Sequence, residues 1–249
     1  MSSVSIDEIL SSADSYYSEN DVMSAGIFLE ASLDMCESGE TFKRAVIINE
    51  LLGVYRKLGE RDKALLCVSE ADKFRSSELN TNMKASLLLN SATVFSNFSE
   101  YDKAIAYYKE AEKIYDSMTY CEPEKISALC NNLGYAYFGD GQYGMSEEYY
   151  YKAVGYAERT PKREILKALT YLNLADLYDA RGDGEKVRLM LSESKKLLEK
   201  CEKRDGEYAY ACLKASSVFS HYGDKDYGKA LEERSEEIYE GFRTIRKIL

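Results

Sequence analysis

The sequence predicts an all-α fold, a right-handed α-α superhelix (solenoid) of about six stacked helix pairs with a C-terminal capping helix. A small residue returns about every 40 positions inside one recurring phrase, clearest as Leu-Gly-Tyr-Ala-Tyr at residues 133–137. Only two prolines, Pro123 and Pro161, interrupt the 249 residues, which are rich in the helix-forming residues Ala, Leu, Glu and Lys. Self-similarity at this period is typical of stacked helix pairs, and 45% hydrophobic residues suffice for a well-buried core.

The recurring small residue marks the start of the second helix of each pair. Successive markers lie 39 to 43 residues apart. An aromatic residue precedes each of the first five by nine positions. Phe219 precedes the sixth by eleven, so we expect a two-residue insertion near residues 223–226. These marker residues are Ala25, Ala64, Ala104, Ser146, Val187 and Ala230.

The markers divide the chain into six helix pairs within a single domain over residues 1–249. In most first helices a small residue three positions before the aromatic lets the two helices approach closely. The turns between helices carry Gly59, Gly141, Gly182 or Gly223, where the chain can leave a helix with positive φ. The last helix, from Tyr227 to about Lys247, is charged on most of its surface, as a cap requires. The pairs are expected at residues 6–38, 42–77, 83–118, 124–160, 164–203 and 207–249.

This pattern resembles the tetratricopeptide repeat over nearly the whole chain, and most closely in the second to fourth pairs. The period of about 40 residues exceeds the 34 usual for the family. It is similar to the long-period repeats of kinesin light chains and of bacterial cytosolic proteins. The resemblance implies that the first helices line a concave groove, and that the protein binds a protein or an extended peptide there.

Composition and motifs argue against several other classes of function. The net charge of −10 would repel a nucleic-acid backbone, so we expect no nucleic-acid partner. The six cysteines form no C-x-x-C pair and His221 is the only histidine, so we expect no metal and no cofactor. No phosphate-binding loop, dinucleotide fingerprint or nucleophile–base constellation occurs, which predicts that the protein is not an enzyme.

The sequence also indicates a cytoplasmic protein without a membrane partner. Residues 1–8 lack the positive and apolar regions of a secretory signal. No apolar run approaches the roughly 20 residues that cross a bilayer. Scattered thiols without disulfide spacing suit a reducing compartment.

Asparagines recur at one phase of the first helices. Asn90, Asn132 and Asn173 each precede the aromatic residue of their pair by five positions. An amide offers a donor and an acceptor, which suits the main chain of an extended peptide. The alternative is that these amides tie neighbouring helices together, and the sequence leaves both open. Carrying the phase of the family across the chain gives the candidate groove residues Asn49, Arg56, Asn90, Asn97, Asn131, Asn132, Tyr135, Asn173, Asp176 and Asp179.

The function that fits best is a non-enzymatic scaffold that binds a protein or peptide in this groove. One alternative is an intracellular receptor for a small regulatory peptide. Another is a self-assembling adaptor, for example a homodimer. The sequence does not identify the partner.

Overall fold

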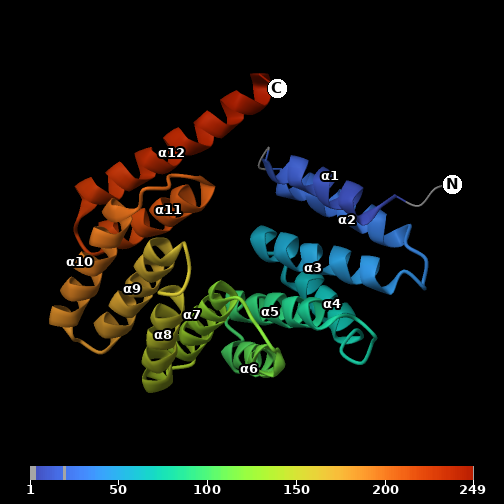
Figure 1. Ribbon diagram of the computed structural model, residues 1–249, viewed down its shortest axis with the longest axis horizontal. Helices are drawn as coiled ribbons and strands as arrows, with labels where there is room; N and C mark the ends of the chain where they lie inside the picture. Colours follow the sequence, from blue (N-terminus) through green and yellow to red (C-terminus); the bar gives the residue numbers. More distant parts are fainter. Residues whose placement is uncertain (1–3, 19–20, 249) are drawn as a thin grey trace. The chain divides into compact units, whose positions relative to one another are not determined.

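The computed structural model describes residues 4–18 and 21–248, and all regular secondary structure in these ranges is α-helical. The predicted all-α class is therefore confirmed. The described residues form twelve helices, which follow one another as six pairs (Figure 1). They are α1 (Ile6–Ser18), α2 (Val22–Asp34), α3 (Thr41–Leu58), α4 (Arg61–Asp72), α5 (Thr81–Asn97), α6 (Tyr101–Ser117), α7 (Pro123–Gly139), α8 (Tyr143–Ala157), α9 (Arg163–Ala180), α10 (Gly184–Lys200), α11 (Gly206–His221) and α12 (Lys225–Ile248).

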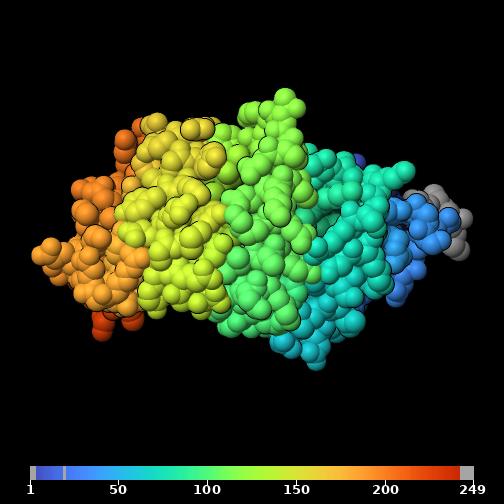
Figure 2. Space-filling view, turned by 90° about the horizontal axis from the view of Figure 1, so that it is seen from below, coloured from blue at the N-terminus to red at the C-terminus, as the bar shows by residue number. Residues whose placement is uncertain are grey.

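The chain divides into two compact units, Met1–Tyr120 with α1 to α6 and Cys121–Leu249 with α7 to α12. Within each unit the pairs follow chain order, which appears as successive bands of colour in Figure 2. First helices of neighbouring pairs contact each other: α3 with α5, α7 with α9, and α9 with α11. The single domain over residues 1–249 and its six repeat ranges stay predictions, and residues 1–3, 19, 20 and 249 lie outside the described residues.

Five of the six marker residues begin their helices in the same way. Each is the fourth residue of a second helix, and its N–H donates to the carbonyl of the residue before that helix. In the fourth pair, for example, Ser146 N–H donates to Gln142 at 3.0 Å. The five helices therefore start at one common point of the repeat, as the spacing predicts.

The sixth marker was assigned wrongly. The fourth residue of α12 is Gly228, whose N–H donates to the Asp224 carbonyl at 2.9 Å, and Gly228 follows Phe219 by nine residues. The expected insertion at residues 223–226 is therefore absent. A Cβ at position 228 would lie 2.2 Å from Ser220 Oγ and 2.8 Å from the Ser216 carbonyl oxygen, so this pair packs too closely for any side chain there.

Close approach of the paired helices depends on small residues, as expected. In the fourth pair, a Cβ on Gly134 of α7 would lie 2.5 Å from the ring of Tyr150 on α8. Ser146 Oγ donates to the Gly134 carbonyl at 2.8 Å and fixes the same crossing. The Tyr150 side chain is buried because glycine leaves room for its ring.

The turns within the pairs use positive φ. The four predicted glycines, Gly59, Gly141, Gly182 and Gly223, have φ between 71° and 96°. In the third pair Ser99 occupies the same place with φ of 60°, although it has a side chain. The left-handed residue reverses the chain so that the second helix can pack on the first.

Tyrosine hydroxyls link successive pairs within each unit. Each donates to a carboxylate on the second helix of the preceding pair, which accounts for several of the 22 tyrosines. The links are Tyr55 to Glu30, Tyr107 to Asp72 at 2.7 Å, Tyr178 to Glu147 at 2.5 Å and Tyr227 to Glu199 at 2.9 Å. No helix in the described ranges has the length and apolar character needed to cross a bilayer.

Candidate functional site

Amide pairs join neighbouring first helices in both units. In the first unit, Asn90 Nδ2 on α5 donates to Asn49 Oδ1 on α3 at 2.8 Å. In the second unit, Asn173 Nδ2 on α9 donates to Asn131 Oδ1 on α7 at 3.0 Å. All four side chains are half-buried. The structure therefore brings together two pairs of predicted site residues.

The partner positions differ by one residue from the phase read in the sequence. Asn49 and Asn131 lie six residues before the aromatic of their pair, whereas Asn90 and Asn173 lie five before theirs. Asn132 shares the phase of Asn90 and Asn173, but its half-buried side chain has no hydrogen bond to any described residue. Two of the three amides thus tie helices together, and the third keeps its donors and acceptor.

The paired amides also keep hydrogen-bonding capacity. An asparagine side chain carries two N–H donors and an oxygen with two lone pairs. The contact between Asn173 and Asn131 uses one donor and one acceptor site. Each pair can therefore hold its helices together and still present polar groups to an extended main chain.

A wider hydrogen-bonded network crosses three first helices of the first unit. The Glu50 carboxylate accepts from the side chains of Tyr17 on α1 and Asn49, and Asn49 accepts from Asn90. Burial raises the pKa of Glu50, and the nearby Asp14 carboxylate raises it further. Burial and the adjacent Glu50 raise the pKa of Tyr17 to about 12. Sequence reasoning missed Tyr17, because its link to Glu50 depends on the packing of α1 on α3.

Asp176 has a partner in the last helix pair of the second unit. Tyr222 donates its hydroxyl to Asp176 Oδ1 at 2.9 Å, and burial raises the pKa of this half-buried carboxyl. The ring of His221 lies edge-on to that of Tyr222, with centroids 4.8 Å apart. Asp179, one turn further along α9, is exposed. Tyr222 was missed because it follows α11, outside the periodic pattern.

The remaining predicted residues share helices with the amides. Arg56 is half-buried on α3, seven residues after Asn49 and so on the same helical face. Tyr135 is 46% exposed on α7, one turn after Asn131. Asn97 is exposed at the end of α5, seven residues after Asn90. That all ten residues contact one ligand stays a prediction.

Sequence and structure comparisons agree on the kind of repeat. Residues 127–160 match the sequence profile of the tetratricopeptide repeat. The TPR-like repeats of a kinesin light chain from P. anserina have a similar fold, with a TM-score of 0.55 and 15% identity over 81% of this chain and 97% of that chain. The protein is a tetratricopeptide-like repeat protein.

Two Rap proteins have the fold of this tetratricopeptide-like chain as well. The apo form of RapI matches with a TM-score of 0.65 and 15% identity, over 97% of this chain and 84% of that chain. The Rap conjugation gene regulator of plasmid pLS20, solved with the Phr* peptide, matches with a TM-score of 0.61 and 15% identity, over 98% of this chain and 76% of that chain. No curated protein sequence matches this tetratricopeptide-like protein significantly. The predicted resemblance to long-period tetratricopeptide repeats is confirmed.

Proposed function

We propose that this tetratricopeptide-like protein is a non-enzymatic scaffold that binds an extended peptide segment of a partner protein along its first helices. The observation that carries this proposal is the pairing of asparagines between neighbouring first helices, at 2.8 Å and 3.0 Å. The pairs fix the positions of amides that still have donors and acceptors for a peptide main chain. Asn132, without a partner among the described residues, is the amide best placed to contact a ligand.

The structural relatives support a peptide as the ligand. The Rap regulator of plasmid pLS20 has this fold and was solved in complex with the Phr* peptide. We therefore keep an intracellular receptor for a small regulatory peptide as a second candidate function. All six cysteines are free thiols, which suits a protein of the reducing cytoplasm.

A selection for peptides tests the proposal without knowledge of the natural partner. A phage-displayed library of random peptides is selected on the full chain, and the enriched peptides are measured by calorimetry. We expect Asn132→Ala to weaken their binding at least tenfold, because lost hydrogen bonds to a buried main chain cost about 1–3 kcal/mol. Its melting temperature should stay unchanged, since the side chain bonds to no described residue.

Gln142→Ala is the matched control, because it removes an exposed amide from the turn between α7 and α8 of the same unit. This variant should bind the selected peptides as the wild type does. Equal binding of these peptides to the wild type and to the Asn90→Ala/Asn132→Ala double variant would show that the first helices do not form the binding surface.

A further inference from the structure

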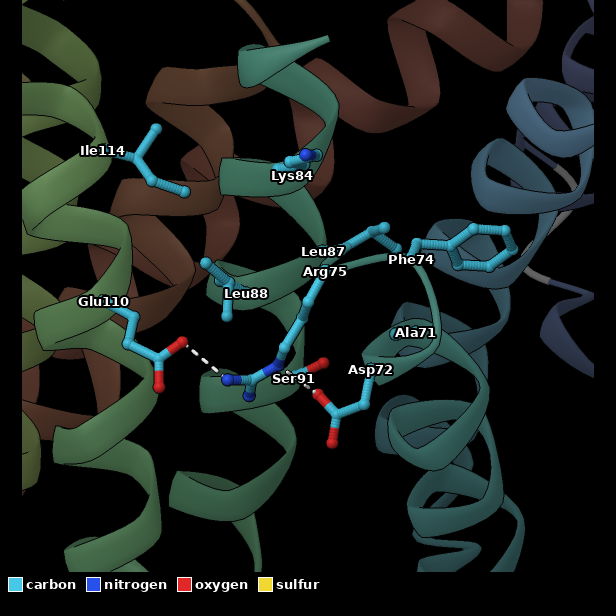
Figure 3. A pocket seen from close by; sticks show the side chains of 10 residues that line it. All are labelled: Ala71, Asp72, Phe74, Arg75, Lys84, Leu87, Leu88, Ser91, Glu110 and Ile114. Atoms are coloured by element: carbon cyan, nitrogen blue, oxygen red, sulfur yellow. Dashed lines mark hydrogen bonds and ion pairs between the residues drawn. The ribbon is translucent and has the colours of Figure 1, made fainter. Parts of the chain in front are cut away.

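The first unit contains a cavity of about 130 Å³ between the end of α4, α5 and α6 (Figure 3). Its wall is largely apolar, with Leu87 and Leu88 from α5 and Ile114 from α6. These leucines lie on a different face of α5 from Asn90, because two or three residues along a helix turn the side chain by roughly 200° or 300°. The cavity is therefore separate from the candidate peptide-binding face.

Arg75 occupies the lower part of the cavity in Figure 3 and holds two carboxylates. Its Nε donates to Asp72 at 2.8 Å, and its Nη1 donates to Glu110 at 2.6 Å. The guanidinium also lies 4.5 Å from the centre of the Tyr107 ring, and the Tyr107 hydroxyl donates to Asp72. Both carboxylates that line the cavity are thus already engaged by the protein.

The polar groups left over at the cavity are donors. Ser91 is only 1% exposed, lines the cavity and makes no hydrogen bond to a described residue. Lys84, at the opposite end from the Arg75 ion pairs in Figure 3, forms no ion pair with the described residues. Nη2 of Arg75 adds a third donor that the two ion pairs do not use. A buried hydroxyl and an unpaired ammonium beside an apolar wall favour an anionic acceptor with an apolar body.

We propose that this cavity binds a small monocarboxylate with an apolar group about the size of a phenyl ring. A cavity of about 150 Å³ accommodates benzene, so the volume here fits one ring or a branched chain of similar size. The apolar group contacts Leu87, Leu88 and Ile114, and the carboxylate lies between Lys84 and Ser91. The carboxylate comes either from a free acid or from the C-terminal residue of a peptide, since the two share this chemistry.

Methyl NMR of the full chain tests the proposal with phenylacetate as the probe. We expect saturable shifts of the Leu87, Leu88 and Ile114 methyl signals, and at least tenfold weaker binding of phenylacetamide. Lys84→Gln should weaken phenylacetate binding about tenfold and leave phenylacetamide binding unchanged. Lys113→Gln, an exposed substitution on α6 with the same change of charge, should have no effect.

N-acetyl-alanyl-phenylalanine distinguishes the two sources of the carboxylate. Tighter binding of this dipeptide than of phenylacetate supports a chain terminus as the ligand, and weaker binding supports a free acid. Equal affinity for phenylacetate and phenylacetamide would overturn the proposal. So would the absence of shifts in all three methyl signals at millimolar phenylacetate. Because the cavity is separate from Asn132, either result leaves the peptide-scaffold proposal unaffected.

Discussion

At the scale of single residues, the contact between Gly134 and Tyr150 sets how closely α7 and α8 approach. The Tyr150 ring fills the space that a Cβ on Gly134 would need, 2.5 Å from Cδ1. The buried hydroxyl of Ser146 uses the same closeness to reach the Gly134 carbonyl at 2.8 Å. Glycine lowers intrinsic helix stability by about 1 kcal/mol relative to alanine, so its presence here reflects packing.

Gly134→Ala should therefore destabilise the protein even though alanine favours the helix. Inserting a methyl group into a filled contact costs about 1–3 kcal/mol, which exceeds the gain of about 1 kcal/mol in helix propensity or cancels it. Urea denaturation measures the change in the free energy of unfolding. Gly155→Ala on α8 is the matched control, because nothing lies within 4 Å of its added Cβ, and it should stabilise the protein by up to about 1 kcal/mol. A stabilised Gly134→Ala variant would contradict the packing argument.

At the scale of elements, links between a tyrosine and a carboxylate hold successive helix pairs together. Glu147 on α8 accepts from the Tyr178 hydroxyl on α9 and from Arg181, each at 2.5 Å. The hydrogen bond from Tyr178 and the interactions with Arg181 hold the pKa of Glu147 below 4.5, although burial opposes them. The ionised carboxylate is thus the form that joins the two pairs.

Glu147→Gln should lower stability in a manner that depends on pH. A lowered pKa in the folded state stabilises the fold fully above 4.5, and this contribution is lost as the pH falls through the lowered value. The difference in unfolding free energy between wild type and variant should therefore be larger at pH 7 than well below pH 4.5, as urea denaturation at both pH values will measure. Glu148→Gln, which breaks only an exposed pair with Lys152, should change stability by less than about 0.5 kcal/mol. A difference for Glu147→Gln that does not vary with pH would exclude the ionised link.

At the scale of the whole molecule, contacts are mostly between neighbouring helices. The helix contacts join elements within a pair or in adjacent pairs, such as α2 with α3 and α9 with α11. In such repeat proteins stability is approximately a sum of repeat and nearest-neighbour terms. A destabilising change in one pair is therefore expected to act mainly on that pair and its neighbours.

Hydrogen exchange on two buried leucines tests this locality. Leu29→Ala in α2 should cost about 2–5 kcal/mol locally and speed exchange in α1 to α3 at least tenfold, with little change in α9 and α10. Leu198→Ala in α10 is the reciprocal control, because it removes an equally buried leucine and should affect α9 to α11 instead. Uniform acceleration across the described helices by either variant would indicate a single cooperative unit.

The sequence alone determined the helix pairs of this protein, because the information for them is local and periodic. Small residues at Ala25, Ala64 and Ala104, with an aromatic nine positions before each, place the helices and their turns. The same reasoning failed at the sixth pair, where Ala230 was chosen although Gly228 makes the close contact with Ser216 and Ser220. Composition could not distinguish two small residues that lie so near each other.

Only the tertiary structure decided which side chains meet across helices. The pairing of Asn90 with Asn49 and of Asn173 with Asn131 depends on the relative register of two helices that are separated by about 40 residues of chain. A shift of one residue rotates a side chain by roughly 100°, so spacing along the sequence could not assign these partners. The cavity beside Arg75 likewise forms only where α4, α5 and α6 come together, so no segment taken by itself could have indicated it.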